Sequence, residues 1–419
     1  EKGYPLYLII DEYDNFTNVI LSEHGQQMFH DLTHASGFYR EYFKQFKGMF
    51  DRIFMMGVSP VTLDDLSSGY NIDWNISVDP RFNAMMGFDE TEVREMFHYY
   101  QQNDMLNGDV EAMIAEMKPW YDNYCFARKS LDDDRVFNCD MTLYYLRWQV
   151  DFHRAPEEMV DKNIRTDYSK LKMLARIDRD SVQEGDRMST IEKIAAEGDI
   201  FVDLHTSFPA ERITDIDNFR SLLYYYGLLT MCGTRGDLIK MSIPNNCVRE
   251  QYFGFLRDYY QKYSSIDLHY LNVMLTDMAY DGRWKPFFES VAQAYRENSA
   301  VRDAMEGERN LQGFLKAYLA LASYYLVEPE LEMNYGYCDF FLLPDKKRYP
   351  DVKHSYILEL KYATRTATDA ELEVQALEGR NQLLQYSEDK IVRCLSEGTT
   401  LHRLLLQFRG WDLVRCEEV

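Results

Sequence analysis

The chain has 419 residues, of which 46% are hydrophobic and 15% aromatic, enough apolar material for the cores of about two to four domains. Its formal net charge of −23 at pH 7 argues against broad, nonspecific binding to nucleic acid, because contacts with phosphate supply most of that affinity. The seven cysteines stand singly, in no zinc-binding spacing, and the sequence shows neither a signal peptide nor an apolar run near the roughly 18 residues of a membrane span. We therefore expect a cytoplasmic protein with reduced thiols and no membrane partner.

The first predicted element is a near-continuous apolar strand, Tyr4–Ile10, that ends in Asp11 and Glu12. Strands of this kind lie in the centre of a parallel sheet that is covered on both faces. The ending resembles a Walker B strand, in which the aspartate holds Mg²⁺ and the glutamate polarises the attacking water. With Tyr13 and Asp14 added, the motif resembles that of an AAA-ATPase-like family. The alternative is an ordinary strand that ends in a polar turn.

A second apolar strand is predicted over Arg52–Pro60. It resembles the sensor strand of the same family, with Ser59 placed to detect the terminal phosphate, and the two strands predict a partial P-loop-type parallel sheet. ATP binding in this fold also requires a Gly-rich loop whose backbone N–H groups and lysine hold the phosphates, and no G-x-x-x-x-G-K-[ST] motif occurs in the sequence. We expect that loop to precede Glu1 in a full-length protein that binds ATP, and we expect no ATP hydrolysis by the chain as given.

The next region is predicted to form a helical lid. Gly87–Val93 indicates a helix start at which Asp89 acts as the N-cap and acidic residues fill the first turn. The aromatic segments Trp120–Phe126 and Val136–Cys139 resemble segments of the same family. We assign both segments to packing of the lid and not to chemistry.

A winged-helix-like region is predicted further along the chain. A helix that ends near Gly227 is followed by a hairpin over residues 231–244, and this order resembles a winged helix. Arg235 and Lys240 of the hairpin could contact nucleic acid. The alternative is a structural adaptor, which the acidic charge of the chain favours.

Two strands rich in aromatic and aliphatic residues, Tyr335–Leu343 and Ser355–Lys361, are predicted near the C-terminus and are joined by a turn-like segment. Alternation along the second strand places Glu359 and Lys361 side by side on one face. The first strand brings Asp339 toward the same place. The pattern predicts a metal site with a lysine beside it.

Such a site suits hydrolysis of a phosphodiester, which needs a hard cation to neutralise the phosphoryl oxygens and to activate a water. Carboxylate oxygens suit Mg²⁺, and a lysine can orient the water and stabilise developing charge. Asp339 followed by Glu359-Leu360-Lys361 resembles the D…E-x-K signature of the PD-(D/E)XK nuclease superfamily, and more narrowly the nuclease-like domain found behind an AAA-ATPase-like domain in many bacterial proteins. The resemblance implies that Asp339, Glu359 and the Leu360 carbonyl bind Mg²⁺ or Mn²⁺ and that Lys361 positions the water. The alternative is a surface carboxylate and a Glu–Lys pair on a half-exposed strand.

Two predicted helices flank these strands. The first continues to about Leu326 and holds Glu308 in line with an apolar stripe, where burial of a glutamate is costly unless it is paired or ligates an ion. The second, Asp369–Ser387, presents Gln382 and Tyr386 on one face. The resemblance implies that Glu308 completes the surroundings of the ion and that Gln382 and Tyr386 support the active site. The alternatives are a first-turn glutamate favoured by the helix dipole and an ordinary polar helix face.

The connection between the two strands offers a local basic patch that could contact nucleic acid despite the acidic net charge; the alternative is a solvated turn. Its basic residues are Lys346, Lys347, Arg348, Lys353 and His354. A last pair of strands, Leu401–Phe408 and Trp411–Cys416, is predicted to turn at Arg409 and Gly410.

The sequence thus predicts a multidomain α/β protein in four parts. These are a partial AAA-ATPase-like core (1–62), a helical lid (63–150), a helical and winged-helix-like region (151–264) and a restriction-endonuclease-like α/β domain (265–419). The expected function is a metal-dependent nuclease acting on nucleic acid, with DNA as the expected substrate, coupled in the full-length protein to an AAA-type ATPase. The alternatives are an ATP-switched binding or scaffold protein with a non-catalytic nuclease-like domain, and a folded remnant of a mobile or duplicated gene. Sequence leaves open the form of the nucleic acid and whether the ATPase half assembles into homo-oligomers.

Overall fold

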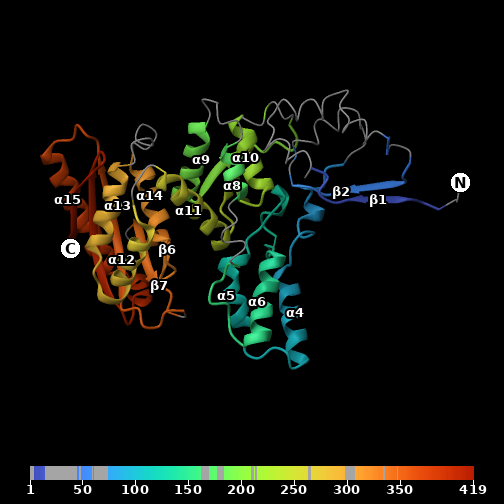
Figure 1. The fold of residues 1–419 in the computed structure, drawn as a ribbon, viewed down its shortest axis with the longest axis horizontal. Helices are drawn as coiled ribbons and strands as arrows, with labels where there is room; N and C mark the ends of the chain where they lie inside the picture. The colour runs from blue at the N-terminus through green and yellow to red at the C-terminus, as the bar shows by residue number, and fades with distance from the viewer. Residues whose placement is uncertain are drawn as a thin grey trace. The chain divides into compact units, whose positions relative to one another are not determined.

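The computed structural model describes residues 4–14, 45–46, 49–58, 60, 74–133, 135–161, 169–176, 184–208, 212, 215–262, 266–297, 307–333, 336–346 and 348–419. The chain forms two compact units, one of residues 1–194 and 198–251 and one of residues 195–197 and 252–419 (Figure 1). The finer division into four domains stays a prediction. Among the described helices, none combines the length and the apolar character that crossing a membrane requires.

The first unit begins with the two predicted strands, β1 (Tyr7–Ile10) and β2 (Arg52–Met55), which pair in parallel. The side chains of Tyr7 and Ile9 are 66% and 70% exposed. The described part of this sheet is therefore open on one face, unlike the covered central strand that the apolar sequence predicts.

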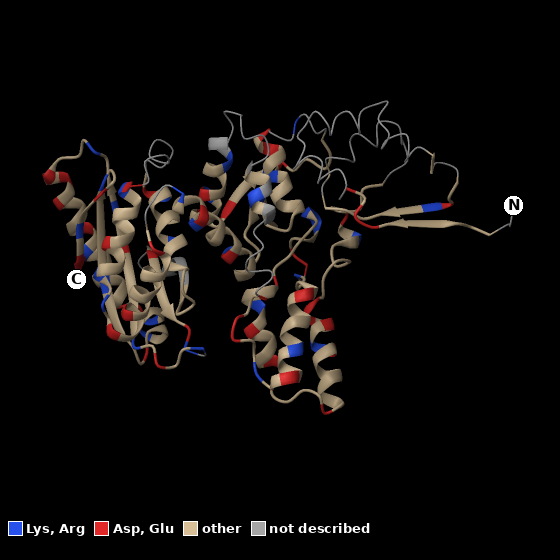
Figure 2. Ribbon diagram, in the orientation of Figure 1, with Lys and Arg blue, Asp and Glu red and all other residues tan. Residues whose placement is uncertain are grey.

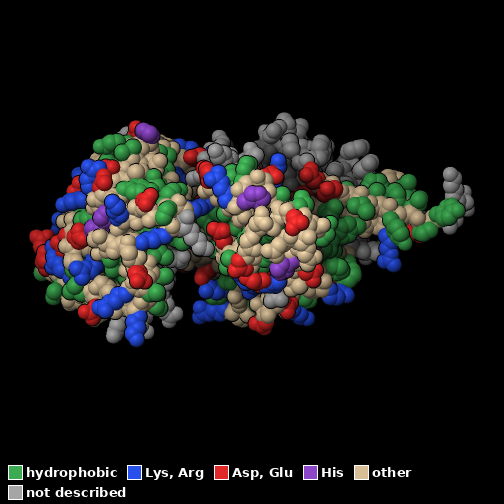
Figure 3. All heavy atoms as spheres, turned by 90° about the horizontal axis from the view of Figure 1, so that it is seen from below, with side chains coloured by type: hydrophobic (Ala, Val, Ile, Leu, Met, Phe, Trp, Pro, Cys, Tyr) green, Lys and Arg blue, Asp and Glu red, His purple; other side chains and the backbone are tan. Residues whose placement is uncertain are grey.

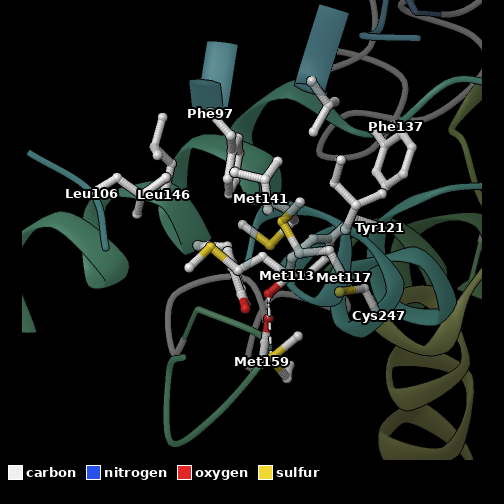
Figure 4. Close-up of a cluster of buried hydrophobic side chains, with 14 of the residues drawn as sticks. Phe97, Leu106, Met113, Met117, Tyr121, Phe137, Met141, Leu146, Met159 and Cys247 are labelled. Carbon is white, nitrogen blue, oxygen red and sulfur yellow. Dashed lines mark hydrogen bonds between the residues drawn. The ribbon is translucent and has the colours of Figure 1, made fainter. Parts of the chain in front are cut away.

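A methionine-rich core holds the helical part of the first unit together. Asp89 caps α4 through a reciprocal capping box with Glu92, as the sequence predicts. Tyr121 is fully buried and donates a hydrogen bond of 2.6 Å to the Met159 carbonyl, and Phe137 packs in the same cluster (Figure 4). The aromatic segments therefore contribute packing, as expected. The elements are η1 (Pro80–Phe82), α4 (Glu90–Gln102), α5 (Val110–Tyr121), η2 (Arg128–Ser130) and α6 (Cys139–Phe152).

The predicted hairpin forms, but it belongs to a three-stranded antiparallel sheet in the order β3-β5-β4. The extra strand β3 follows α9 after Gly198 and pairs with β5; at four residues it carries little pattern of its own. Lys240 pairs with Asp199 at 2.8 Å, and the Arg235 guanidinium lies 5.9 Å from the centre of the Phe201 ring. Both basic residues thus interact with β3, which favours the adaptor over a nucleic-acid wing. The elements are α8 (Ser169–Arg176), α9 (Glu184–Glu197), β3 (Asp199–Val202), α10 (Ile216–Tyr225), β4 (Thr230–Arg235), β5 (Leu238–Ser242) and α11 (Asn246–Gln261).

The second unit is built on a five-stranded sheet in the order β10-β9-β8-β7-β6, in which β8 and β9 are parallel and the other neighbours are antiparallel. The central strand β8 is covered on both faces: Tyr356 donates to the Met278 carbonyl of α12, whereas Ile357 packs in the core that includes Leu383 of α15. The elements are α12 (Leu268–Asp281), α13 (Lys285–Glu297), α14 (Glu308–Leu319), β6 (Tyr325–Met333), β7 (Gly336–Pro344), β8 (His354–Ala363), α15 (Asp369–Ser387), α16 (Lys390–Leu395), β9 (Thr400–Arg409) and β10 (Asp412–Glu418).

One element of this sheet differs from the sequence prediction. The helix expected to reach Leu326 ends at Leu319, and β6 begins at Tyr325. Pro329 pairs in register with Phe340 but has no N–H to donate, so it is suited to β6, which lies at the edge of the sheet. Apolar residues continue from the helix into the strand, and periodicity alone does not separate the two.

Candidate active site

The site begins where β7 and β8 separate. Their register runs from Leu342 opposite Tyr356 to Phe340 opposite Leu358, and beyond that point the described residues of the two strands do not pair. There the Leu360 N–H donates a hydrogen bond of 2.7 Å to Oδ2 of Asp339. The Asp339 carboxylate therefore accepts a hydrogen bond that a backbone carbonyl would accept in a continuous sheet. This bond holds the carboxylate at the point where β7 and β8 diverge.

A second contact fixes the other oxygen of Asp339. Nε2 of Gln312, one turn after Glu308 on α14, donates to Oδ1 at 2.9 Å. Burial raises the pKa of Asp339 to about 6, although the hydrogen bond from Leu360 lowers it. Gln312 was not predicted from the sequence; its i, i+4 spacing from Glu308 is the signal that could have found it.

Glu359 is buried beside Asp339 and is 3% exposed. Its Oε1 accepts a hydrogen bond of 2.8 Å from Nζ of Lys361, while its Oε2 is buried and has no hydrogen-bond partner among the described residues. Burial raises the pKa of Glu359 to about 7, and the charge of Asp339 is the next cause. When ionised, the carboxyl groups of Asp339 and Glu359 therefore repel each other, and burial limits their solvation.

Lys361 is held against α15 and is not directed freely into solvent; its side chain is 19% exposed. Gly379 of α15 permits this approach. A Cβ at position 379 would lie 2.7 Å from Cδ1 of Leu405 and 3.3 Å from Cε of Lys361. The glycine thus allows the helix to pack closely over the lysine.

The predicted pair on α15 also lies at the site. Tyr386 is 2% exposed, and Nε2 of Gln382 donates to its hydroxyl at 3.5 Å. Burial, followed by the charge of Glu359, raises the pKa of Tyr386 to about 12. Tyr386 therefore stays protonated at neutral pH and close to the carboxyl pair.

Glu308 does not fulfil the expectation of a buried residue in the apolar stripe. It is the first residue of α14 and is exposed, so the cost of burial does not apply to it. Its charge nevertheless contributes to raising the pKa of both Asp339 and Glu359. Glu308 is therefore near the carboxyl pair, at the open side of the site.

The basic loop lies at the other end of the β7–β8 hairpin from the site. Asp339 is five residues from Pro344, the end of β7, which corresponds to about 17 Å of strand. Lys346 donates to two backbone carbonyls in the turn before β9, at 3.1 and 3.0 Å. Lys346 is therefore bound away from the candidate site, and Lys347 lies outside the described residues.

At the N-terminal motif, Asp11 is exposed, and its Oδ1 accepts the Glu12 N–H at 2.9 Å. Glu12 has a left-handed backbone, with φ of 49°. Ser59 lies outside the described residues. The buried acid here is Asp14, whose two oxygens accept the Val58 N–H at 3.2 and 3.1 Å. Asp14 thus joins the ends of the two strands, a role that the sequence motif did not suggest.

Charge is mixed over the described surface. Acidic and basic positions are interspersed along both units in Figure 2, and on the face shown in Figure 3 the two kinds of side chain lie among one another. Within the described ranges, no three His, Cys, Asp or Glu side chains converge as ligands of one metal ion.

The second unit thus combines a sheet of parallel and antiparallel strands with the buried carboxyl group of Glu359, the half-buried carboxyl group of Asp339 and a lysine, all at the fork between β7 and β8. Comparison with protein families agrees: residues 306–418 match the model of the PD-(D/E)XK nuclease superfamily, and residues 1–67 match that of a predicted AAA-ATPase. The chain thus joins an AAA-ATPase-like segment to a domain of the PD-(D/E)XK nuclease superfamily, the architecture that the motifs indicated. Searches of curated proteins and of solved structures found no match.

Proposed function

We propose that the second unit hydrolyses phosphodiester bonds of nucleic acid, with DNA as the first substrate to test, in a reaction that depends on Mg²⁺ or Mn²⁺. The observation that supports this most is the state of Glu359. One oxygen of this buried carboxyl group is bound by Lys361, and the other has no partner among the described residues. A buried carboxylate left in this way is costly unless a cation compensates it.

The residues present suit a hard divalent cation. Asp339 and Glu359 offer oxygen atoms on adjacent strands, and the charge of Asp339 is, after burial, the next cause that raises the pKa of Glu359. Mg²⁺ takes one or two protein carboxylates and keeps several waters, so two carboxylates and the Leu360 carbonyl are a sufficient protein contribution. When bound, such an ion neutralises phosphoryl oxygens and lowers the pKa of a coordinated water.

The other side chains have roles that follow from their contacts. Lys361 has three N–H donors and uses one on Glu359, which leaves others to orient a water and to stabilise charge on the phosphate. Gln312 and the Leu360 N–H hold the Asp339 carboxylate in one orientation. Tyr386 and Gln382 close the α15 side of the site, and Glu308 lies at its exposed side.

A second function is supported by a different observation. The net charge of −23 and the distance of the basic loop from the site favour an ATP-switched binding or scaffold protein whose nuclease-like domain does not cleave. For either function, coupling to an AAA-type ATPase stays a prediction. Metal binding distinguishes the two functions, because only the catalytic one requires it.

The test is cleavage of supercoiled plasmid and of single-stranded oligonucleotides with Mg²⁺ or Mn²⁺, together with calorimetric titration of Mn²⁺. We expect Asp339→Asn to abolish both cleavage and Mn²⁺ binding. Asp351→Asn, an exposed acid in the distant loop, is the matched control and should change neither. Cleavage that persists in Asp339→Asn contradicts the catalytic proposal, and the absence of Mn²⁺ binding in the wild type favours the scaffold.

A further inference from the structure

A fully buried glutamine on β9 is the neighbour of Lys361 in the sheet. Gln407 pairs in register with Lys361 of β8 on one side and with Arg415 of β10 on the other. It lies two residues after Leu405 and therefore points to the same face of the sheet, the face that α15 covers. A buried amide is costly unless its polar atoms are hydrogen-bonded, so the contacts of Gln407 explain why it is tolerated there.

The side chain of Gln407 uses both of its N–H groups and its oxygen. Nε2 donates to the Leu372 carbonyl at 2.8 Å and to Oε1 of Gln375 at 3.3 Å, and both acceptors belong to α15. Its Oε1 accepts a hydrogen bond of 3.2 Å from Nε of Arg415. A backbone carbonyl only accepts and a guanidinium only donates, so the orientation of the amide is determined.

Gln375 continues this row of hydrogen bonds to the strand that carries Lys361. Its Nε2 donates to the carbonyl of Tyr362, the residue directly after Lys361, at 3.3 Å. The donors therefore point in one direction, from Arg415 through Gln407 and Gln375 to the backbone of β8. The row connects three strands and α15 at the level of the lysine.

We propose that Gln407 is a positioning residue for Lys361: together with Gln375 it fixes α15 against the sheet and so keeps Nζ of Lys361 on Glu359. Gly379 lies one turn after Gln375, and a Cβ there would be 3.3 Å from Cε of Lys361. A shift of this turn away from the sheet would open space beside the lysine, which now makes a hydrogen bond of 2.8 Å with Glu359. The inference rests on the proposed function for what Lys361 does in the reaction.

This role depends on the hydrogen bonds of Gln407 and not only on its volume. Methionine is unbranched and adaptable, so at position 407 it would fill much of the same space. It has no N–H group, so the Leu372 carbonyl and Gln375 would lose their donor, and Arg415 would lose its amide acceptor. Gln407→Met therefore separates hydrogen bonding from packing.

The test uses the whole chain and two measurements. The first is the rate at which limiting acetic anhydride acetylates Lys361 in EDTA, followed by mass spectrometry, with the other lysines as an internal reference. We expect faster acetylation of Lys361 in Gln407→Met, because its amine is no longer held on Glu359. The second is the steady-state kinetics of DNA cleavage: kcat should fall by up to about a hundredfold, the cost of a misplacement of about 1 Å, while KM stays unchanged.

Gln385→Met, at an exposed glutamine of α15, is the matched control and should behave as the wild type. Gln375→Met breaks the same row at its next member and should change both measurements in the same direction, so it decides the question where Gln407→Met does not fold. Acetylation of Lys361 at the wild-type rate in these variants overturns the proposal. So does an unchanged kcat in a variant whose Lys361 is acetylated faster.

The two measurements also separate this inference from the proposed function. A wild-type chain that does not cleave DNA contradicts the proposed function, and the acetylation of Lys361 then decides by itself whether Gln407 positions the lysine.

Discussion

Two strands of this protein combine an apolar run with an acidic residue, directly after the run in β1 and within it in β8, and they differ in burial. In β1, Tyr7 and Ile9 are mostly exposed, and Asp11 at its end is exposed as well. In β8, both faces are covered and Glu359 is 3% exposed. The first acid stays solvated, whereas the second is desolvated beside another carboxyl group.

The difference shows that a motif becomes a chemical site only through its surroundings. Burial raises the pKa of Glu359 to about 7, and that cost is what a bound cation would offset. At the N-terminal strands the buried acid is Asp14, which is satisfied by the Val58 N–H and therefore has a structural role.

The largest effect is expected for Lys361→Met. Loss of one donor that stabilises transition-state charge costs about a hundredfold to a thousandfold in rate, so cleavage by the second unit should be nearly abolished. Asp11→Asn should leave cleavage unchanged, because the proposed chemistry uses no residue of the first unit. The measurement is the rate of plasmid cleavage under single-turnover conditions. Equal rates for Lys361→Met and Asp11→Asn would contradict the proposal that cleavage depends on the site at β8 and not on the acid after β1.

The pH dependence of stability should reveal the carboxyl pair. The pKa of Asp339 is raised to about 6 and that of Glu359 to about 7, so the folded state binds these protons more tightly than the unfolded state. Their contribution is therefore greatest in acid and is lost as the pH rises through about 6 to 7. We expect the free energy of unfolding to fall between pH 5 and 8 by on the order of 2 kcal/mol because of this pair.

The measurement is urea unfolding in the presence of EDTA, followed at the transition of the second unit. Glu359→Gln should flatten the dependence, Asp351→Asn should not, and Mg²⁺ should restore stability at pH 8 in the wild type. A slope that is the same in Glu359→Gln and the wild type would show that the carboxyl pair is not its source.

A smaller effect is expected for Gly379→Ala. The added methyl group would meet Leu405 and Lys361, and overpacking of this kind costs about 1–3 kcal/mol, offset in part by the roughly 1 kcal/mol that alanine contributes in a helix. Thermal unfolding and cleavage should both decline as Lys361 is displaced. A variant more stable than the wild type would mean that α15 does not pack tightly at this position.

The smallest effect is expected for Gln312→Ala. Asp339 would keep the Leu360 N–H but lose its second donor, so Mn²⁺ affinity should fall by about tenfold, the lower end of the effect seen for partners of metal ligands. Gln293→Ala, an exposed glutamine on α13, is the control for calorimetry. An unchanged affinity would assign Gln312 to packing alone.

Much of the second unit could be predicted from the sequence. Alternation along β8 and the helical spacing of α15 placed Glu359, Lys361, Gln382 and Tyr386 on the elements where they lie, because both periods follow from local backbone geometry. The strand β6 was not predicted. Apolar residues continue from the end of α14 into β6, and their spacing does not distinguish a helix from a strand.

Local spacing and composition were enough to predict the strands β7 and β8, the helix α15, the acid cap of α4 and the acidic and basic residues available to the site. Tertiary structure alone decided which acids are buried. It brought Gln312 to Asp339, left Glu308 exposed, and placed the basic loop at the far end of the hairpin. Desolvation and hydrogen-bond partners depend on segments distant in sequence, and for this reason no local pattern reports them.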